Sequence, residues 1–200
     1  LHQLKALRER GGDIVVINPA REPGLVRFAV PKSPASLLAG GHEIASAYLQ
    51  PNVGSDIALF KGIAKALSAA DALDHEFISE HALGFADYQD DLAQTSWHEI
   101  CARTGLERGQ IESVARIYAR SNAAVFAWGM GLTHHTHGVA NIEQLANLAL
   151  LRGMVGRRYA GLLPLRGHSN VQGIGTIGVK PVLPDDVFQA LESRLGVSLP

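Results

Sequence analysis

Arg166 is the residue of this sequence best suited to chemistry on a small anion. It lies between Leu165 and Gly167, in a loop with further glycines at positions 161 and 173, and His168 and Asn170 follow it closely. A buried arginine is costly without an anionic partner, and its planar guanidinium can hold a carboxylate through two parallel hydrogen bonds. We therefore predict that Arg166 meets an anionic ligand. An arginine that only stabilises its loop by bonding carbonyls is the alternative.

A second glycine-rich segment has the composition of a phosphate-binding turn. The apolar run at residues 123–128 leads into Gly129, Met130 and Gly131, and a helical pattern follows at residues 138–151. Such a turn brings backbone N–H groups and a helix start beside a ligand. A dinucleotide fingerprint is disfavoured, because its sixth position is His134 and the nearby carboxylate, Glu143, lies inside the predicted helix. A phosphate loop ending in Gly-Lys-Ser/Thr does not occur in the sequence.

The side chains that could bind metals do not form a recognised metal motif. His134, His135 and His137 are close in sequence, but no His-Glu-x-x-His run or cysteine pair accompanies them, so we predict no metal site there. Cys101 is the only cysteine, which excludes an internal disulfide and a cluster held by several cysteines of this chain. Its place at helical spacing with apolar neighbours predicts a buried, unreactive thiol.

Two segments of the first half carry polar groups where an α/β sheet binds ligands, beyond the carboxyl ends of its strands. A predicted strand at residues 13–17 ends at Asn18, which can bond a sugar or base, and at Arg21, which can contact phosphate. Farther along, Gly54 and Ser55 precede Asp56, whose carboxylate matches two adjacent donors on guanine. The alternatives are a simple Asn-Pro turn and an acid that only complements the helix dipole.

The elements that must position these residues indicate an α/β fold. We predict an open, mostly parallel sheet flanked by helices, Rossmann-like, followed by an irregular Gly-rich segment from residue 153. Residues 13–17 and 123–128 are the predicted strands, and residues 18–54 are predicted to be largely irregular. Ser55 is expected to cap the helix that follows it. The predicted helices are residues 1–10, 56–70, 74–82, 85–93, 96–103, 106–121, 138–151 and 186–195.

Composition excludes several classes of protein. The 200 residues are 46% hydrophobic and 18% charged with a net charge of -1, which is typical of a globular domain without a broad basic surface. Nucleic-acid binding is therefore not expected. No apolar run approaches the roughly 20 residues of a membrane span, and residues 1–10 form a charged amphipathic segment instead of a signal peptide. We expect a cytoplasmic protein.

Three segments, WGMGLTHHTHG, NLALLRGMVG and PLRGHSNVQG, resemble the molybdopterin oxidoreductase family, and specifically its formate dehydrogenase-like alpha subunits. The resemblance implies a molybdenum cofactor with two molybdopterin guanine dinucleotides, whose guanosine end lies near Asn18 and the Gly54–Asp56 turn. His134 and His135 are then interpreted as residues of the cofactor pocket. The full set of implied cofactor-binding residues is Asn18, Arg21, Gly54, Ser55, Asp56, Gly129, Met130, Gly131, His134, Arg166, Gly167 and Asn170.

The same resemblance implies an activity. Arg166 and His168 become the catalytic residues, with Arg166 orienting formate or a similarly small substrate beside molybdenum, and the electrons pass to iron-sulfur centres and a redox partner. The 4Fe-4S cluster and the molybdenum ligand are expected outside this chain, so the chain is interpreted as a single cofactor-binding domain, residues 1–200, cut from a larger catalytic subunit and inactive alone. The alternative is a non-catalytic domain of the same fold that binds a nucleotide cofactor or a partner.

Two positions depart from the pattern of the family. Met154 stands where the family usually has asparagine, and Arg158 and Tyr159 replace a typical Pro-Gly pair. The first departure removes one expected polar contact, and the second changes the expected shape of the loop.

Overall fold

The computed structural model describes residues 1–29, 38, 40–179 and 184–198. The chain divides into two compact units, Leu1–Pro164 and Leu165–Pro200, and each is described by itself. The first contains all the strands among the described residues, and the second contains two helices. The prediction that both belong to a single domain stays a prediction.

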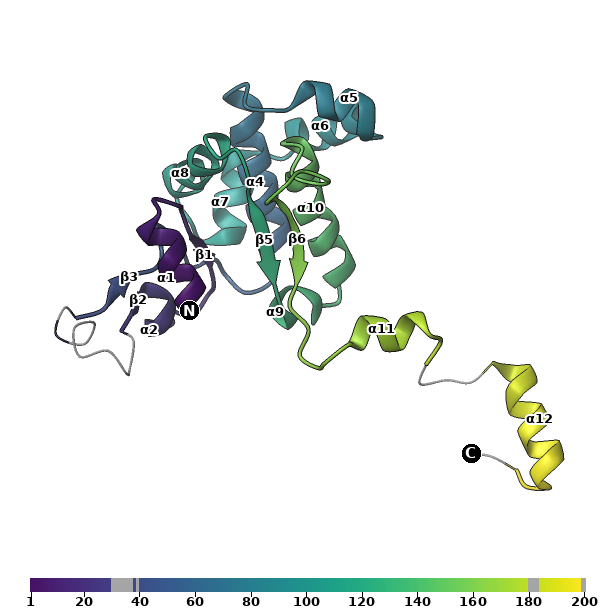
Figure 1. Ribbon diagram of the computed structural model, residues 1–200. Helices are drawn as coiled ribbons and strands as arrows, with labels where there is room; N and C mark the ends of the chain where they lie inside the picture. The colour runs from purple at the N-terminus through teal and green to yellow at the C-terminus, as the bar shows by residue number, and fades with distance from the viewer. Residues whose placement is uncertain (30–37, 39, 180–183, 199–200) are drawn as a thin grey trace. The chain divides into compact units, whose positions relative to one another are not determined.

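The first unit contains short strands that pair mainly in parallel (Figure 1). β1 (Val15–Ile17) pairs in parallel with β4 (Ala47–Leu49), and β5 (Val125–Trp128) pairs in parallel with β6 (Gly161–Pro164). A small antiparallel pair, β2 (Arg27–Phe28) and β3 (His42–Glu43), lies between β1 and β4 in the chain. The predicted α/β class with parallel strands and flanking helices is thereby confirmed.

The helices of the first unit agree with the hydrophobic periodicity of the sequence, and every helix predicted there is present. Two short helices that were not predicted, α2 and α9, also have all their residues within the described ranges. The helices are α1 (His2–Glu9), α2 (Pro23–Val26), α4 (Asp56–Ala69), α5 (His75–His81), α6 (Phe85–Gln94), α7 (Trp97–Thr104), α8 (Arg108–Ala119), α9 (Met130–Thr133) and α10 (Gly138–Leu151).

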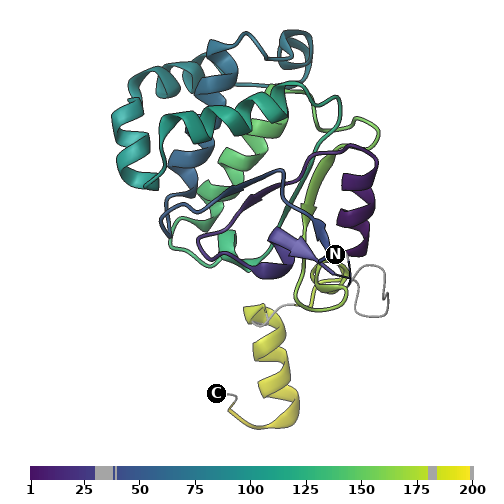
Figure 2. The ribbon, with the colours of Figure 1, turned by 90° about the vertical axis from the view of Figure 1, so that its left-hand side faces the viewer.

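Helix α4 is the centre of the core. Its apolar residues recur at helical spacing, and Leu59, Phe60, Ile63 and Leu67 are all buried. α4 contacts α7, α8 and α10, which together form a helical layer against the strands. Figure 2 shows α1, the purple helix, on the opposite side of β5 and β6 from that layer. The strands are thus sandwiched within the first unit.

Four strands were not predicted from the sequence, although two of them shape the site. β2, β3 and β4 fall in the stretch expected to be irregular, and β6 falls in the segment expected to be a loop. Residues 30–37 and 39 of that stretch lie outside the described residues. Each of these strands has only two to four residues, so its pairing depends on a distant partner and not on a local pattern.

The environments of Cys101 and Met154 differ from expectation. Cys101 is half-buried, while Ile100 and Thr104 form the buried face of α7, so the prediction of a buried cysteine is wrong. Cys101 lies next to that face because the turn of the helix places Ile100 at its centre. Met154 is fully buried in the core. An asparagine there would need buried hydrogen-bond partners, so methionine suits this apolar position.

The second unit contains α11 (Val171–Thr176) and α12 (Asp185–Leu195), of which α12 was predicted. α12 begins with Asp185 and Asp186 and carries Arg194 in its last turn, so its charges complement the helix dipole. None of the helices in the described ranges combines the length and apolar character that crossing a membrane requires.

Candidate functional site

The carboxyl ends of β1 and β4 lie side by side and form one edge of the candidate site. Ile17 is in register with Leu49, so the turns that follow the two strands start together. The amide of Gln50 after β4 donates to the carbonyl of Pro19 after β1 at 3.0 Å. This bond ties the two predicted ligand-binding segments to one another, as expected for neighbouring parallel strands.

The side chain of Asn18 forms hydrogen bonds within its own turn. Its side-chain oxygen accepts from the Ala20 backbone N–H at 2.9 Å, and its amide donates to the Glu22 carboxylate at 2.7 Å. This is the turn geometry that the sequence left open as the alternative. Arg21 is exposed next to it. Whether either residue contacts a ligand stays a prediction.

The segment after β4 forms a tight turn that starts α4. Gly54 has φ +81°, and a Cβ added to it would meet no atom within 4 Å, so the backbone borders open space. Ser55 occupies the N-cap position, as predicted, but its side chain does not accept a capping bond. Its hydroxyl donates instead to the Asn52 carbonyl at 2.6 Å, which tightens the turn. Asp56 follows as the first residue of the helix.

Asp56 is half-buried, and burial raises the pKa of its carboxyl above the ordinary value. Its own backbone N–H and the nearby imidazoles of His135 and His137 oppose this and lower the pKa. The carboxyl therefore lies within electrostatic reach of two histidines from a distant part of the sequence. A half-buried acid with this partial compensation is suited to accepting hydrogen bonds from a ligand.

The predicted glycine turn brings those histidines to Asp56. Gly129 is the N-cap residue of α9, and the ring Nε2 of His135 is 2.8 Å from the carbonyl of Gly131. The rings of His135 and His137 stack with centroids 5.4 Å apart. His134 is exposed at the end of α9, where its N–H donates to the Met130 carbonyl. Among the described residues there is no cluster of three or more potential metal ligands.

Asn141 of α10 fixes the position of this turn. It is fully buried on α10, and its amide donates to the Leu132 carbonyl of α9 at 2.9 Å. Its side-chain oxygen has no partner within the described structure. A buried amide bonded to a loop carbonyl holds the loop in one place.

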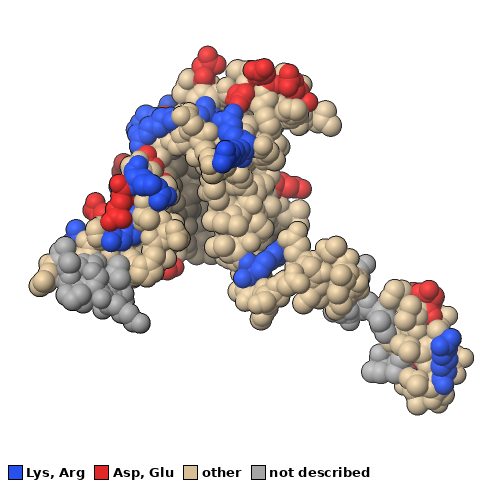
Figure 3. All heavy atoms as spheres, viewed as in Figure 1, with Lys and Arg blue, Asp and Glu red and all other residues tan. Residues whose placement is uncertain are grey.

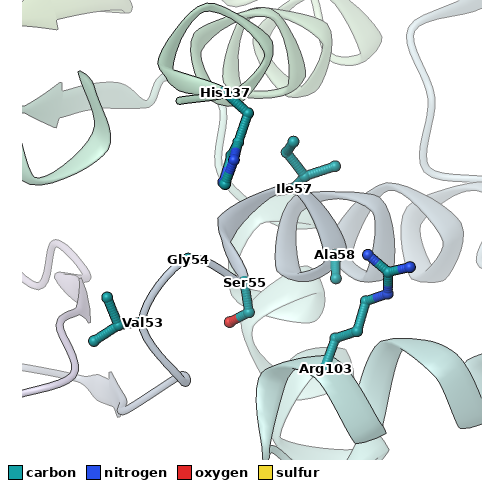
Figure 4. Close-up of a pocket in the computed structure, with 7 residues that line it drawn as sticks. All are labelled: Val53, Gly54, Ser55, Ile57, Ala58, Arg103 and His137. Atoms are coloured by element: carbon teal, nitrogen blue, oxygen red, sulfur yellow. The ribbon is translucent and has the colours of Figure 1, made fainter. Parts of the chain in front are cut away.

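A cavity of about 290 Å³ lies at the start of α4 (Figure 4). Arg103 of α7 and His137 at the start of α10 lie on opposite sides of the turn, and the Arg103 guanidinium pairs with Glu99 at 2.9 Å. The volume of the cavity suits a base or a sugar and is too small for a whole dinucleotide. The residues that line it are Val53, Gly54, Ser55, Ile57, Ala58, Arg103 and His137.

Sequence reasoning found part of this cavity and missed part. Gly54 and Ser55 were predicted, and Asp56 comes next to them. Arg103 was missed because it lies on a helix with no local motif, and only the packing of α7 against α4 brings it to the turn. His137 was considered as a metal ligand alone. Its position three residues after His134, at the start of a predicted helix, was the signal that could have assigned it to the site.

The remaining predicted residues belong to the second unit. Arg166, Gly167, His168 and Asn170 are exposed there, and Asn170 is the N-cap residue of α11 with φ +54°. β6 ends at Pro164, which is in register with Trp128, so Arg166 follows one parallel strand as Gly129 follows its partner. The cofactor-binding role of Arg166, Gly167 and Asn170 and the catalytic role of Arg166 and His168 stay predictions.

Comparison with known proteins gives matches along most of the chain. A family model described as molybdopterin oxidoreductase matches residues 2–189. Protein YdeP of Escherichia coli is 39% identical over the whole chain, which spans 28% of that protein. Formate dehydrogenase H of Escherichia coli is 32% identical over 69% of the chain and 19% of its own length. The fold resembles acetylene hydratase from Pelobacter acetylenicus, with a TM-score of 0.63 and 20% identity over 79% of this chain and 19% of that one.

Proposed function

Because the chain belongs to the molybdopterin oxidoreductase family, we propose that it forms the guanosine-binding part of a molybdenum-dependent oxidoreductase subunit. The cofactor is proposed to be the guanine dinucleotide form of molybdopterin. The chain spans 28% of the YdeP protein, so the activity proposed here is that of a longer subunit. In that subunit, this chain is proposed to bind the guanosine end of the cofactor.

The half-buried carboxyl of Asp56, a residue between Ser55 and Ile57 of the cavity lining, carries this proposal. The open space beside the half-buried Gly54 lets a flat base approach its backbone closely, and the start of α4 supplies backbone N–H groups. A carboxylate accepts from two adjacent donors, which matches the ring N–H and the amine of guanine. These residues therefore fit the guanine end of the cofactor.

The proposed roles of the other predicted residues follow from their position and charge. Arg21 contacts a phosphate of the cofactor, and Asn18 contacts its sugar. Gly129, Met130, Gly131 and His134 line the path of the pterin. Gly167 and Asn170 of the second unit are proposed to bind the cofactor as well, and His168 to act on the substrate with Arg166.

The proposed reaction is the oxidation of formate or a similarly small acid. Formate loses two electrons and one proton and becomes carbon dioxide. A bound molybdenum cofactor would supply the two-electron acceptor for this oxidation, and iron-sulfur centres elsewhere in the subunit would carry the electrons to a redox partner. The guanidinium of Arg166 holds the substrate carboxylate in line and offsets its charge.

Replacing Asp56 by asparagine in the complete subunit tests the guanine assignment. The amide keeps the size of the side chain but places a donor against a donor of guanine, at a cost of about 1–3 kcal/mol. We expect lower cofactor content in the purified subunit. Asp87→Asn is the matched control, because Asp87 is also a first-turn acid but is exposed on α6.

The stability of the cofactor-free protein separates binding from folding. Since burial raises the pKa of Asp56, its ionised form destabilises the fold, and this cost grows as the pH rises above the unfolded value of 3.8. Asp56→Asn should therefore not lower the thermal stability at neutral pH. Unchanged cofactor content, or a loss equal to that of Asp87→Asn, contradicts the assignment.

Arg166→Lys tests the substrate assignment. Lysine keeps the charge but loses the planar two-pronged contact, so turnover of the small acid should fall by roughly 100-fold or more. Molybdenum content and thermal stability should stay unchanged. Near-native turnover would refute the role, whereas loss of folding would support the alternative of a structural arginine.

A further inference from the structure

Residues 71–96, which include α5 and α6, are strongly acidic. They contain seven aspartates and glutamates and no lysine or arginine, although the whole chain has a net charge of only -1. Asp74 pairs with Arg157 and Asp91 pairs with Lys61, so other elements neutralise two of the seven acids. The other five are exposed, and none of them pairs with a lysine or arginine of the described structure: Asp71, Glu76, Glu80, Asp87 and Asp90.

The loop that precedes β6, residues 155–160, lies against the start of α5. The guanidinium of Arg157 donates to the Asp74 carboxylate at 3.1 Å and to the Asn122 carbonyl at 3.1 Å. Just before the loop, a Cβ on Gly153 would lie 3.1 Å from Cγ of Phe77 in α5. The loop and the acidic helices therefore form one continuous surface.

Arg158 of this loop has no acidic partner among the described residues, unlike the arginines around it. Arg157 is paired as described, and Arg120 at the end of α8 pairs with Asp13, two residues before β1, at 2.6 Å. Arg158 lies over the ring of Tyr159 instead, and both side chains are exposed. Tyrosine and arginine are the residue types that often dominate the binding energy of protein interfaces.

Exposed apolar side chains accompany the charges on both parts of this surface. Leu83, between α5 and α6, is 102% exposed, the highest value of any large apolar residue in the described ranges. Tyr159 and Val155 are the exposed apolar residues of the loop. One exposed leucine is ordinary in a protein surface, but apolar groups among unpaired charges of both signs are typical of a contact with another protein.

The two parts of this surface carry opposite charges side by side. Figure 3 shows acidic atoms in red over α5 and α6 and basic atoms in blue next to them. Such a surface is complementary to itself under a two-fold rotation, because the basic part of each copy then meets the acidic part of the other. The net charge of -1 adds little general repulsion between copies.

We propose that this surface, residues 71–94 and 155–160, is an interface between two copies of the subunit related by a two-fold axis. Arg158 of each copy faces the acids of α5 and α6 of the other, and Leu83 and Tyr159 are the apolar anchors. α5 follows the end of α4, whereas the cavity lies at its start, and a helix of 14 residues is about 20 Å long. The interface therefore leaves the candidate site open and does not depend on the proposed function.

Sedimentation of the longer subunit over a series of concentrations tests the proposal. We expect a dimer that weakens as salt is added. Arg158→Glu places like charges against each other and should raise the dissociation constant roughly 10-fold or more. Adding Glu80→Arg to that variant should recover association, because the reversed charges attract again across the axis. Arg10→Glu is the matched control, since Arg10 is exposed after α1 and outside this surface.

Leu83→Ser tests the same interface without a change of charge. It should also weaken the dimer by roughly 10-fold. The thermal stability of the monomer should not change, because Leu83 is exposed there. This variant decides the matter if Arg158→Glu fails to fold.

Two outcomes would overturn the proposal. The first is a subunit that stays monomeric up to about 100 μM, which would mean that another part of the subunit or a different protein covers this surface. The second is a dimer that Arg158→Glu and Leu83→Ser weaken no more than Arg10→Glu does, which would place the interface elsewhere. Neither measurement uses the cofactor or the activity, so a failed cofactor assignment would leave the result unchanged.

Discussion

At the scale of single residues, Tyr159 adopts a backbone conformation that suits glycine. Its φ is +66°, and its side chain is 76% exposed. The guanidinium of Arg158 lies over its ring at 4.7 Å from the centroid. This pair replaces the Pro-Gly pair that the family resemblance implies, so the loop keeps the backbone shape of a glycine without having the residue.

Tyr159→Gly should therefore raise the free energy of unfolding by about 1 kcal/mol, because it removes the strain of a left-handed tyrosine. The gain will be reduced by the loss of an exposed stacking contact with Arg158. Tyr159→Ala is the matched control, since it removes the same ring but keeps the strain. Chemical denaturation measures both variants, and a glycine variant no more stable than the alanine variant would contradict this explanation.

The site residues differ in how far sequence predicts them. Ser55 and Asp56 stand just before a strong helical pattern, so their place at a helix start could be predicted locally. Asn18 was equally well placed, yet its hydrogen bonds are taken up by Ala20 and Glu22. That outcome depends on the shape of the turn. Arg103 reaches the cavity through tertiary packing, for which no local signal exists.

At the scale of elements, α4 packs unusually closely against its neighbours. A Cβ on Gly62 would lie 3.0 Å from Cγ2 of Ile100 in α7 and 3.2 Å from Cγ2 of Ile111 in α8. Both isoleucines are fully buried. Gly62 thus allows three helices to meet at one point, which keeps the start of α4 and its cavity in place.

Gly62→Ala should lower the free energy of unfolding by about 1–3 kcal/mol, because overpacking outweighs the better helix propensity of alanine. Gly109→Ala in α8 is the control, since a Cβ there would meet nothing within 4 Å. That substitution should leave stability unchanged or raise it by up to about 1 kcal/mol. Thermal and chemical unfolding compare the two variants, and equal effects would show that packing at Gly62 is not limiting.

The helices were predictable and the short strands were not, for a physical reason. A helix such as α10 repeats its apolar residues over 14 positions, so its sequence alone defines the buried face. β4 has three residues and β3 has two, and β3 consists of a histidine and a glutamate. Their backbone hydrogen bonds join them to segments far away in the sequence. A short stretch of sequence around each strand therefore does not include its partner.

At the scale of the whole molecule, the chain contains the candidate cofactor-binding residues but only one cysteine that could bind a metal. The first unit holds the cavity and the second holds Arg166. Cys101 is the only cysteine and is half-buried on α7. The proposed iron-sulfur cluster, and a thiolate ligand to molybdenum, would therefore come from other parts of the proposed subunit.

This chain, expressed alone, should contain neither stoichiometric molybdenum nor an iron-sulfur cluster. One cysteine cannot supply the four ligands that such a cluster usually needs. Elemental analysis of the purified chain measures both metals, with the longer subunit as the positive control. Finding about one molybdenum per chain would mean that these residues hold the metal without the rest of the subunit.

The Asp13–Arg120 salt bridge also bears on the order of folding. α4, α7 and α8 follow one another closely in the chain and can pack while contacts are still local. The salt bridge joins residues 107 positions apart, so closing that loop costs more entropy and is slower. The helical layer should thus form early and the strand layer late. The candidate site edge is then among the last parts of the molecule to become ordered, so a newly made chain should stay open to the proposed cofactor until the strands pair.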